Sequence, residues 1–393
     1  MSATTGQPEP GWTSTVLIAV SLIAGFVAGL IVLPLIWALV LGGLLGIAGV
    51  VLLRRPAWRT GSLLVASVLL AFSGAEAMFG VLAPPPVNRD VRKANTPSDW
   101  TVSDPSMGYR PRPGTTVDVV ATYGDELVYR RTYTIDATGA RLTPGSRDSG
   151  PTYLFIGDSY MFGEGLADNE TLPSRFATRL RAGAHVVNLG VLGHSPGHLV
   201  RAMETGVYDR YVAGKVAAVV TWISPLQLPR LTGDGGWLGT SPRYTLDAAC
   251  AGGLRHTGTF HAHRLTDPLA GLSYLGRTYL ASYARAANAG LERERAALSI
   301  ALMTRLRDLA RERYNAPVVV VYDWLDREEE GHNDLVYVPT LRAISRLGME
   351  MISVRKITGQ GPGRADYVIP RDGHPNARLA DLLADQLARL LDR

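Results

Sequence analysis

The hydrophobic pattern divides the chain into an apolar N-terminal part and a longer part in which apolar and polar stretches alternate. Residues 15–53 are almost wholly apolar and carry no charge. This run is about twice the roughly 20 residues that a helix needs to cross a bilayer, and Pro34 near its middle indicates a turn. A third apolar run follows. The pattern therefore predicts a polar, disordered tail and then three transmembrane helices, at residues 1–14, 15–33, 35–53 and 61–83.

Positive charge between the second and third predicted helices indicates their orientation. Arg54, Arg55 and Arg59 lie in this short loop, and the positive-inside rule places such a loop in the cytoplasm. Everything after residue 83 is then extracytoplasmic. The basic residues that follow the third span weigh against this orientation, and a single kinked segment over 15–53 would instead place the enzyme in the cytoplasm. We favour the extracytoplasmic arrangement; Arg89, Arg92 and Lys93 are those basic residues.

Two polar details of the helical part bear on its role. Glu76 lies inside the third span, where a carboxylate suggests a functional site; a position near the outer end, facing the other helices, is the interpretation we favour. Gly42, Gly43 and Gly46 in the second span would allow close helix packing. No basic segment or cleavage site precedes the first span, which argues against a removable signal peptide.

Residues 84–150 are predicted to lead from the membrane to a larger domain. Pro84, Pro85 and Pro86 end the third helix, and residues 84–115 read as an extended linker. Residues 116–123 and 126–135 are rich in β-branched and aromatic residues and flank Gly124-Asp125, which is a hairpin signal. The hairpin would be either a lid or substrate-binding edge, or a packing appendage, and we favour the appendage.

From residue 151 to the end, short apolar runs alternate with helical patterns. This alternation predicts a parallel sheet with helices on both faces. Many Gly, Pro and Thr residues interrupt it at 224–280, which we interpret as an insertion over the active-site face. The predicted strands are 153–156, 185–188, 216–223, 316–322 and 349–354, and the predicted helices are 172–180, 197–211, 282–313 and 377–391.

A candidate nucleophile follows the first of these strands. The run Tyr153–Ile156 leads into Gly157-Asp158-Ser159, and a tight turn at the carboxyl end of a parallel strand can expose a serine hydroxyl. A serine is a poor nucleophile until a base takes its proton. The segment Arg371-Asp372-Gly373-His374 near the C-terminus offers such a base, with a carboxylate to orient it.

These blocks resemble those of the GDSL/SGNH hydrolase family over roughly residues 151–393. Gly157-Asp158-Ser159 is similar to its nucleophile block, Asn188-Leu189-Gly190 to its second block, and Asp372 with His374 to its final block. The resemblance implies a flavodoxin-like three-layer α/β/α domain with a parallel sheet. It also implies that Ser159 is the nucleophile, His374 the base and Asp372 its partner. The backbone N–H groups of Ser159 and Gly190 would form the oxyanion hole.

The chain departs from the family pattern at two places. One residue separates Asp372 from His374, where the family usually has two; this shorter form is similar to that of alginate-type acetyltransferases. The third block normally supplies an Asn side chain, but residues 222–230 contain none. Gln227 carries an amide donor and is the substitute we expect, so the oxyanion hole has either two donors or three.

Composition excludes several other classes of function. The net charge is only +5 although the pI is about 9.3, and no segment combines Lys and Arg with aromatic residues as nucleic-acid-binding segments do. Cys250 is the single cysteine, so no internal disulfide forms. His261 and His263 could form a metal pair, but without a third ligand nearby we favour a solvent-exposed loop. We therefore expect no cofactor, no metal and no nucleic-acid partner.

Taken with the resemblance, the sequence predicts a membrane-anchored, multi-pass serine esterase or acyltransferase with an extracytoplasmic catalytic domain. Members of this layout commonly act on acyl esters of carbohydrates, often acetyl groups, and the lipid bilayer is the second expected partner. Water as acyl acceptor would make an esterase, and a sugar hydroxyl would make a transferase. The alternatives are a catalytically weak glycan-binding or polysaccharide-assembly protein that keeps the fold, and an enzyme for lipid esters.

Overall fold

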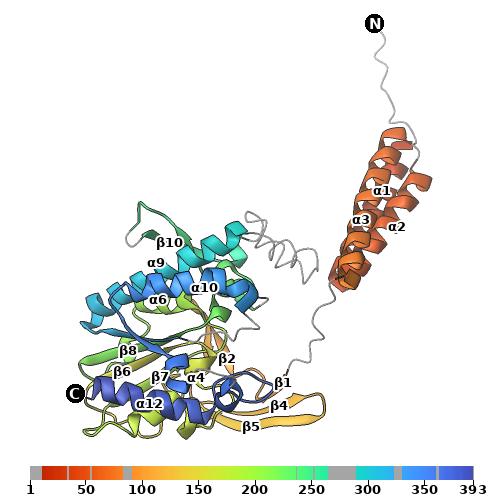
Figure 1. Ribbon diagram of the computed structural model, residues 1–393. Coiled ribbons are helices and arrows are strands. Elements are labelled where there is room, and N and C mark those ends of the chain that lie inside the picture. The colour runs from red at the N-terminus through yellow and green to blue at the C-terminus, as the bar shows by residue number, and fades with distance from the viewer. Residues whose placement is uncertain are drawn as a thin grey trace. The chain divides into compact units, whose positions relative to one another are not determined.

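The computed structural model divides into two compact units, which are described separately (Figure 1). The first holds the N-terminal helices, and the second comprises Arg89–Gly271 and Asn288–Arg393. The structure describes the chain apart from residues 1–10, 33–34, 54, 83–90, 236, 251–252, 264–288, 323–329, 360–362 and 393. Part of the predicted insertion, residues 264–280, and the start of the predicted helix 282–313 lie outside the described residues.

The first unit contains three apolar helices. They are α1 (Gly11–Val32), α2 (Leu35–Leu52) and α3 (Pro56–Leu82). Helix α1 begins inside the predicted tail. Pro56 starts α3, where the missing backbone N–H of proline breaks no hydrogen bond within the helix. The segment Pro56–Met78 is long and apolar enough to cross a membrane, while the apolar segments of α1 and α2 are shorter. On this criterion only one of the three predicted spans among the described residues qualifies.

Glycines of α2 provide the close packing that the sequence predicts. A Cβ added at Gly46 would lie 2.8 Å from the Cβ of Ala66 on α3, and one at Gly43 would lie 2.5 Å from Leu70. At Gly42, an added Cβ would meet Phe26 of α1 at the same 2.5 Å. Helices approach this closely only where small residues face each other. Glu76 of α3 is 5% exposed within this unit.

The segment that leads into the second unit is more structured than the predicted linker. Strands β1 (Arg92–Thr96), β4 (Thr116–Tyr123) and β5 (Glu126–Thr134) form an antiparallel sheet, and β2 (Thr101–Asp104) pairs with β3 (Gly108–Pro111). The predicted hairpin is correct as β4–β5. The extended linker over 84–115 is wrong in its described part. Strand β1 is polar and buries neither face, so its sequence lacks the alternation of apolar and polar residues by which a strand is predicted. We call residues 91–150 the lead-in.

The centre of the second unit is a five-stranded parallel sheet in the order β12-β11-β8-β6-β7. Counted along the chain this is the flavodoxin-like order 2-1-3-4-5. In such sheets ligands bind at the carboxyl ends of the strands, where the strand order reverses, which is beside β6. The strands are β6 (Thr152–Gly157), β7 (His185–Gly190), β8 (Val216–Ile223), β11 (Val318–Tyr322) and β12 (Glu350–Ser353).

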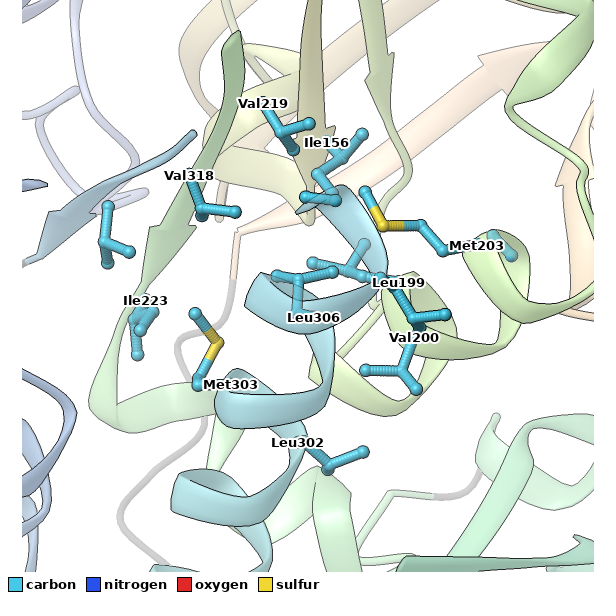
Figure 2. Packing of buried hydrophobic residues seen from close by; sticks show 14 of the residues in the cluster. Ile156, Leu199, Val200, Met203, Val219, Ile223, Leu302, Met303, Leu306 and Val318 are labelled. Atoms are coloured by element: carbon cyan, nitrogen blue, oxygen red, sulfur yellow. The ribbon is translucent and has the colours of Figure 1, made fainter. Parts of the chain in front are cut away.

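Helices cover both faces of this sheet, as the sequence predicts. One face packs against α6 (Pro196–Glu204), α9 (Ala289–Tyr314) and α10 (Glu330–Ser345). Figure 2 shows the core between α9 and the strands. The other face packs against α5 (Leu172–Ala177), α12 (Ala377–Leu391) and the β4–β5 hairpin. Thus the second unit has three layers, with the β4–β5 hairpin of the lead-in on the α12 side.

Short elements connect these layers and form the predicted insertion. The predicted helix 197–211 ends at Glu204, and a 3-10 turn, η2, follows at Asp209–Tyr211. Helix α11 (Val354–Thr358) follows β12, while η1 and η8 span Asp168–Glu170 and Gly363–Tyr367. The described insertion contains η3 (Pro225–Gln227), η4 (Pro229–Thr232), η5 (Leu238–Thr240), the antiparallel pair β9 (Pro242–Leu246) and β10 (Leu254–Thr259), and η7 (His261–His263).

Candidate active site

The turn after β6 presents Ser159 at the start of a four-residue helix, α4 (Ser159–Phe162). Asp158 caps this helix, and its carboxylate accepts a hydrogen bond from the N–H of Tyr160 at 3.0 Å. Gly163 ends the helix with a φ of 83°, a conformation that favours glycine. The serine therefore lies at the carboxyl end of a central strand, as predicted, with only 5% of its surface exposed.

A second turn places Asp372 and His374 side by side. The N–H of Gly373 donates to Ile369 O at 2.9 Å, and the N–H of Ile369 donates to His374 O at 2.7 Å. Gly373 has a φ of 81°, a backbone conformation that glycine adopts with little strain. The turn explains how a single intervening residue suffices to bring the carboxylate and the imidazole together.

The structure brings the three predicted catalytic side chains together. The Nε2 atom of His374 lies 2.9 Å from Ser159 Oγ, and its Nδ1 atom is hydrogen-bonded to Asp372 Oδ1. The side chain of Asp372 is buried, while 17% of the His374 side chain is exposed. This is the arrangement that nucleophilic catalysis by serine requires: a base within reach of the hydroxyl and a carboxylate that orients the base.

Two charged residues that the sequence did not single out complete the cluster. Glu164, in the loop after α4, has Oε2 at 3.1 Å from His374 Nε2. Lys93, on β1 of the lead-in, lies between the two carboxylates, with Nζ 2.6 Å from Glu164 Oε1 and 3.1 Å from Asp372 Oδ2. The sequence indicates Lys93 only as one of the basic charges that follow the third predicted helix. Glu164 lies five residues after Ser159 between two glycines, and that proximity was the available signal.

These contacts change the proton affinities of all four groups. Burial disfavours the charge on His374, but hydrogen bonds to Asp372 and Glu164 outweigh it and raise the pKa of His374 to about 9. Burial likewise opposes ionisation of Asp372, yet contacts with His374 and Lys93 lower its pKa to about 2. Despite burial, the same two cations lower the pKa of Glu164, and the two carboxylates raise the pKa of Lys93.

The predicted oxyanion-hole donors have different surroundings. The N–H of Ser159 belongs to the first turn of α4, where N–H groups have no acceptor within the helix. The N–H of Gly190 donates to Asn188 Oδ1 at 3.1 Å. Gln227 Nε2 donates to Trp222 O at 3.1 Å, which uses one of its two N–H donors. Each of the three as an oxyanion donor therefore stays a prediction.

Gly190 has a further, steric role. A Cβ added there would lie 2.7 Å from the carbonyl carbon of Met161 and even closer to the backbone nitrogen of Phe162. Only glycine lets the end of β7 approach α4 this closely. The side chain of Asn188 joins the same elements, since its Nδ2 donates to Phe162 O at 3.1 Å. The second block therefore packs directly against α4.

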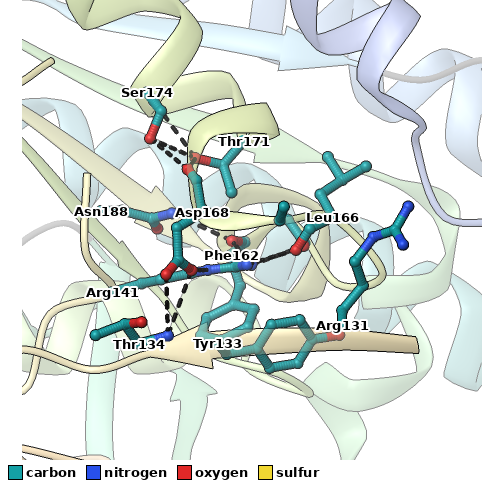
Figure 3. Close-up of polar contacts among 12 residues, drawn as sticks. Arg131, Tyr133, Thr134, Arg141, Phe162, Leu166, Asp168, Thr171, Ser174 and Asn188 are labelled. Carbon is teal, nitrogen blue, oxygen red and sulfur yellow. Dashed lines mark hydrogen bonds and ion pairs between the residues drawn. The ribbon is translucent and has the colours of Figure 1, made fainter. Parts of the chain in front are cut away.

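A buried arginine of the lead-in holds the loop that carries Glu164 (Figure 3). The guanidinium of Arg141 donates to the carbonyls of Phe162 and Gly163 at 2.7 Å and of Leu166 at 2.6 Å, and pairs with Asp168 at 3.1 Å. It also lies over the rings of Phe162 and Tyr133. The hydroxyl of Tyr133 accepts a hydrogen bond from the N–H of Gly165 at 2.8 Å.

The other polar residues of interest lie around the site or away from it. Arg230 donates to Asp158 Oδ2 at 2.9 Å and to His194 O at 2.8 Å, so it links the insertion to the turn that carries Ser159. The rings of His194 and His198 are buried and stacked at 4.1 Å. His263 bonds Thr257 O. Among the described residues, no group of three or more His, Cys, Asp or Glu side chains has an arrangement that could hold a metal ion.

Comparisons with known proteins found solved structures only. No family model matches the chain, and no curated protein matches it. A G-D-S-L family lipolytic protein from Veillonella parvula DSM 2008 is 13% identical, with a TM-score of 0.35, covering 62% of this chain and 100% of its own. The acetyl xylan esterase Est2A from the rumen bacterium Butyrivibrio proteoclasticus is 12% identical, with a TM-score of 0.32, covering 77% and 98%.

A third solved structure is that of a carbohydrate esterase whose active site has divergent catalytic and non-catalytic binding functions. It is 14% identical, with a TM-score of 0.31, and covers 66% of this chain and 69% of its own. TM-scores this low leave the function to be inferred from the chain's own site. In its sequence blocks and among solved structures, the chain is similar to GDSL/SGNH hydrolases and carbohydrate esterases.

Proposed function

We propose that this chain is a serine ester hydrolase or acyltransferase of the GDSL/SGNH kind that forms an acyl-enzyme on Ser159. The observation that carries the proposal is the contact of 2.9 Å between Ser159 Oγ and His374 Nε2, with Asp372 on the opposite ring nitrogen. These contacts support the roles that acyl transfer would give the three residues, with Ser159 as nucleophile, His374 as base and Asp372 as the carboxylate that orients the base. The site lies where the strand order of the sheet reverses.

The reaction would proceed in two halves. In the first, His374 takes the proton of Ser159 as Oγ attacks the acyl carbonyl, and then gives that proton to the departing alcohol. Backbone N–H groups at the start of α4 and the end of β7 would stabilise the oxyanion, each by about 3 kcal/mol. In the second, His374 takes a proton from water or from an acceptor hydroxyl as that oxygen attacks the acyl carbonyl, and then returns the proton to Ser159 Oγ as the acyl bond to serine breaks. Water makes the enzyme an esterase, and a sugar hydroxyl makes it a transferase.

We propose an acyl ester of a carbohydrate, with acetyl as the acyl group, as the substrate; this rests on the resemblance of the sequence blocks. We also propose that α1, α2 and α3 anchor the chain in a bilayer with the second unit extracytoplasmic. The charge-free apolar run 15–53, with Arg54 and Arg55 before α3 and Arg59 in its first turn, supports this placement.

One observation favours the alternative, a catalytically weak glycan-binding or polysaccharide-assembly protein. The Gly190 N–H and one N–H of the Gln227 amide already have acceptors inside the protein. If neither is released when substrate binds, the oxyanion would depend on the Ser159 N–H and the second N–H of Gln227. The loss of one donor in such a site costs roughly 10²- to 10³-fold in rate, so turnover separates the two proposals.

The test is labelling of intact cells with a membrane-impermeant fluorophosphonate, at pH 7 and at pH 9, in wild type and Ser159→Ala. The matched control is Ser345→Ala, which removes an exposed hydroxyl on α10. We expect labelling of wild type and control that is lost in Ser159→Ala. Labelling confined to lysates would overturn the extracytoplasmic placement. No labelling at either pH, with no turnover of acetyl esters, would favour the binding protein.

A further inference from the structure

The two ring nitrogens of His374 each face a carboxylate. Nδ1 is hydrogen-bonded to Asp372, and Nε2 lies 3.1 Å from Glu164 Oε2 as well as 2.9 Å from Ser159 Oγ. An ionised carboxylate accepts hydrogen bonds and donates none. If Nε2 carried no proton, its lone pair would therefore face a lone pair of Glu164 Oε2, which is a repulsive contact. Both nitrogens donate only when the imidazole carries its second proton.

The charges of the cluster lead to the same conclusion. Glu164 and Asp372 are both buried carboxylates, with side chains 8% and 1% exposed. Lys93 contacts both but carries one positive charge. A buried cluster with an unpaired charge is costly, and a charged His374 brings the sum of the four groups to zero. The other polar or titratable side chains that face the cluster from the packed elements are Ser159, Tyr160, Tyr129, Tyr133 and Arg141.

We propose that Glu164, itself held by Lys93 of the lead-in, is a positioning residue that keeps His374 charged in the resting site. This inference rests on the function proposed above. Ser159 is then not activated at rest, because Nε2 has no free lone pair to take its proton. Before the first half-reaction, the Nε2 proton must pass to solvent base, after which Nε2 accepts the proton of Ser159. Ser159 is thus expected to react as a nucleophile mainly in alkaline conditions.

The distinguishing variant is Glu164→Gln, which keeps the size of the side chain and removes its charge. A neutral amide no longer stabilises the imidazolium, so the base becomes available at lower pH. We expect the midpoint of fluorophosphonate labelling against pH to fall by one unit or more, and labelling at pH 7 to rise about tenfold for each unit. Lys93→Met should move the midpoint upward, because it removes a positive charge that opposes a second one on His374.

The control is Glu312→Gln, the same change at an exposed residue of α9 whose partner is Arg305. It should leave the midpoint unchanged. An unchanged midpoint in Glu164→Gln, with labelling that still requires Ser159, would overturn the inference and keep the proposed function. Labelling that is absent from wild type at every pH, or that persists in Ser159→Ala, would instead overturn the proposed function.

A measurement on wild type decides the matter even if Glu164→Gln does not fold. The full-length protein, labelled with ¹³C-histidine in detergent micelles, is titrated by NMR, and the signal of His374 is assigned by its absence in His374→Gln. We expect an imidazolium at pH 7 that loses its proton well above neutral pH. A His374 that is already neutral at pH 7 would overturn the inference.

Discussion

The parallel sheet and the antiparallel lead-in contribute different things to one site. The sheet and its connections carry Ser159, Asp372 and His374, which would perform the chemistry. The lead-in carries Lys93 and Arg141, which fix the charge of the cluster and the loop beside the nucleophile. The comparison shows that the position of Ser159, the proposed nucleophile, follows from strand topology, whereas the charges around it depend on a segment outside the sheet.

The largest effect is expected from a change on the sheet side, Asp372→Asn. The amide cannot stabilise the imidazolium and favours the wrong tautomer of His374. We expect the rate of acyl-ester turnover to fall by roughly 10²- to 10⁴-fold, the range of general base catalysis. The measurement is steady-state turnover of an acetyl ester at the pH optimum of each variant. A loss below tenfold would mean that Glu164 alone can orient His374.

The next effect is on folding and lies in the lead-in. Arg141→Met would leave the carbonyls of Phe162, Gly163 and Leu166 and the carboxylate of Asp168 without their buried donor. Breaking a buried charged pair costs about 3–5 kcal/mol of unfolding free energy. Thermal unfolding in detergent measures this, with Arg130→Met on exposed β5 surface as the control. A melting temperature equal to that of the control would mean that the lead-in does not hold the loop.

The same division explains what could be predicted from sequence. The strand 216–223 and the closing helix 377–391 are found at their predicted bounds, because burial leaves a continuous apolar run in the strand and a helical periodicity in the helix. Strand β1 has no such pattern, since it is a polar edge strand stabilised by pairing with β4. Lys93 therefore read as a charge near the membrane, although the fold places it on Glu164 and Asp372.

Within the candidate site, the predicted catalytic residues belong to compact sequence blocks, whereas Lys93 and Arg230 lie far along the chain from the groups that they contact. Ser159 is adjacent to its capping Asp158, and His374 is two residues from Asp372. The contact between Lys93 and Glu164 joins residues 71 positions apart, and that of Arg230 with Asp158 joins residues 72 positions apart. Only the folded backbone brings such pairs together, because local spacing carries no signal for them.

A smaller effect is expected at the insertion, where Arg230 binds the capping carboxylate. Arg230→Gln removes the charged hydrogen bond to Asp158 Oδ2 but can still donate to His194 O. A hydrogen bond to a charged group contributes about 1.5–3 kcal/mol, so we expect a loss of about 2 kcal/mol or less in unfolding free energy. Thermal unfolding measures it. A loss as large as that of Arg141→Met would mean that the insertion stabilises the turn at Ser159 as much as the lead-in does.

The smallest effect, counted for each unit of pH, is the alkaline loss of stability that the charged His374 implies. Its pKa is about 9 in the folded protein against an ordinary value of 6.5. A raised pKa contributes stability that is fully present below 6.5 and is lost as the pH rises through 9. The slope cannot exceed about 1.4 kcal/mol per pH unit for one proton.

Above about pH 7.5 the buried pair His194 and His198 does not contribute, because burial lowers the pKa of each in the folded protein and the ordinary value of 6.5 leaves both neutral in the unfolded chain as well. We therefore expect the melting temperature of the full-length protein to fall from that pH up to about 9. The fall should be shallower in Glu164→Gln, since His374 then gains less from folding in its charged form. Equal slopes in the two proteins would show that Glu164 has no part in the charge of His374, and would leave the lead-in as a support for the loop alone.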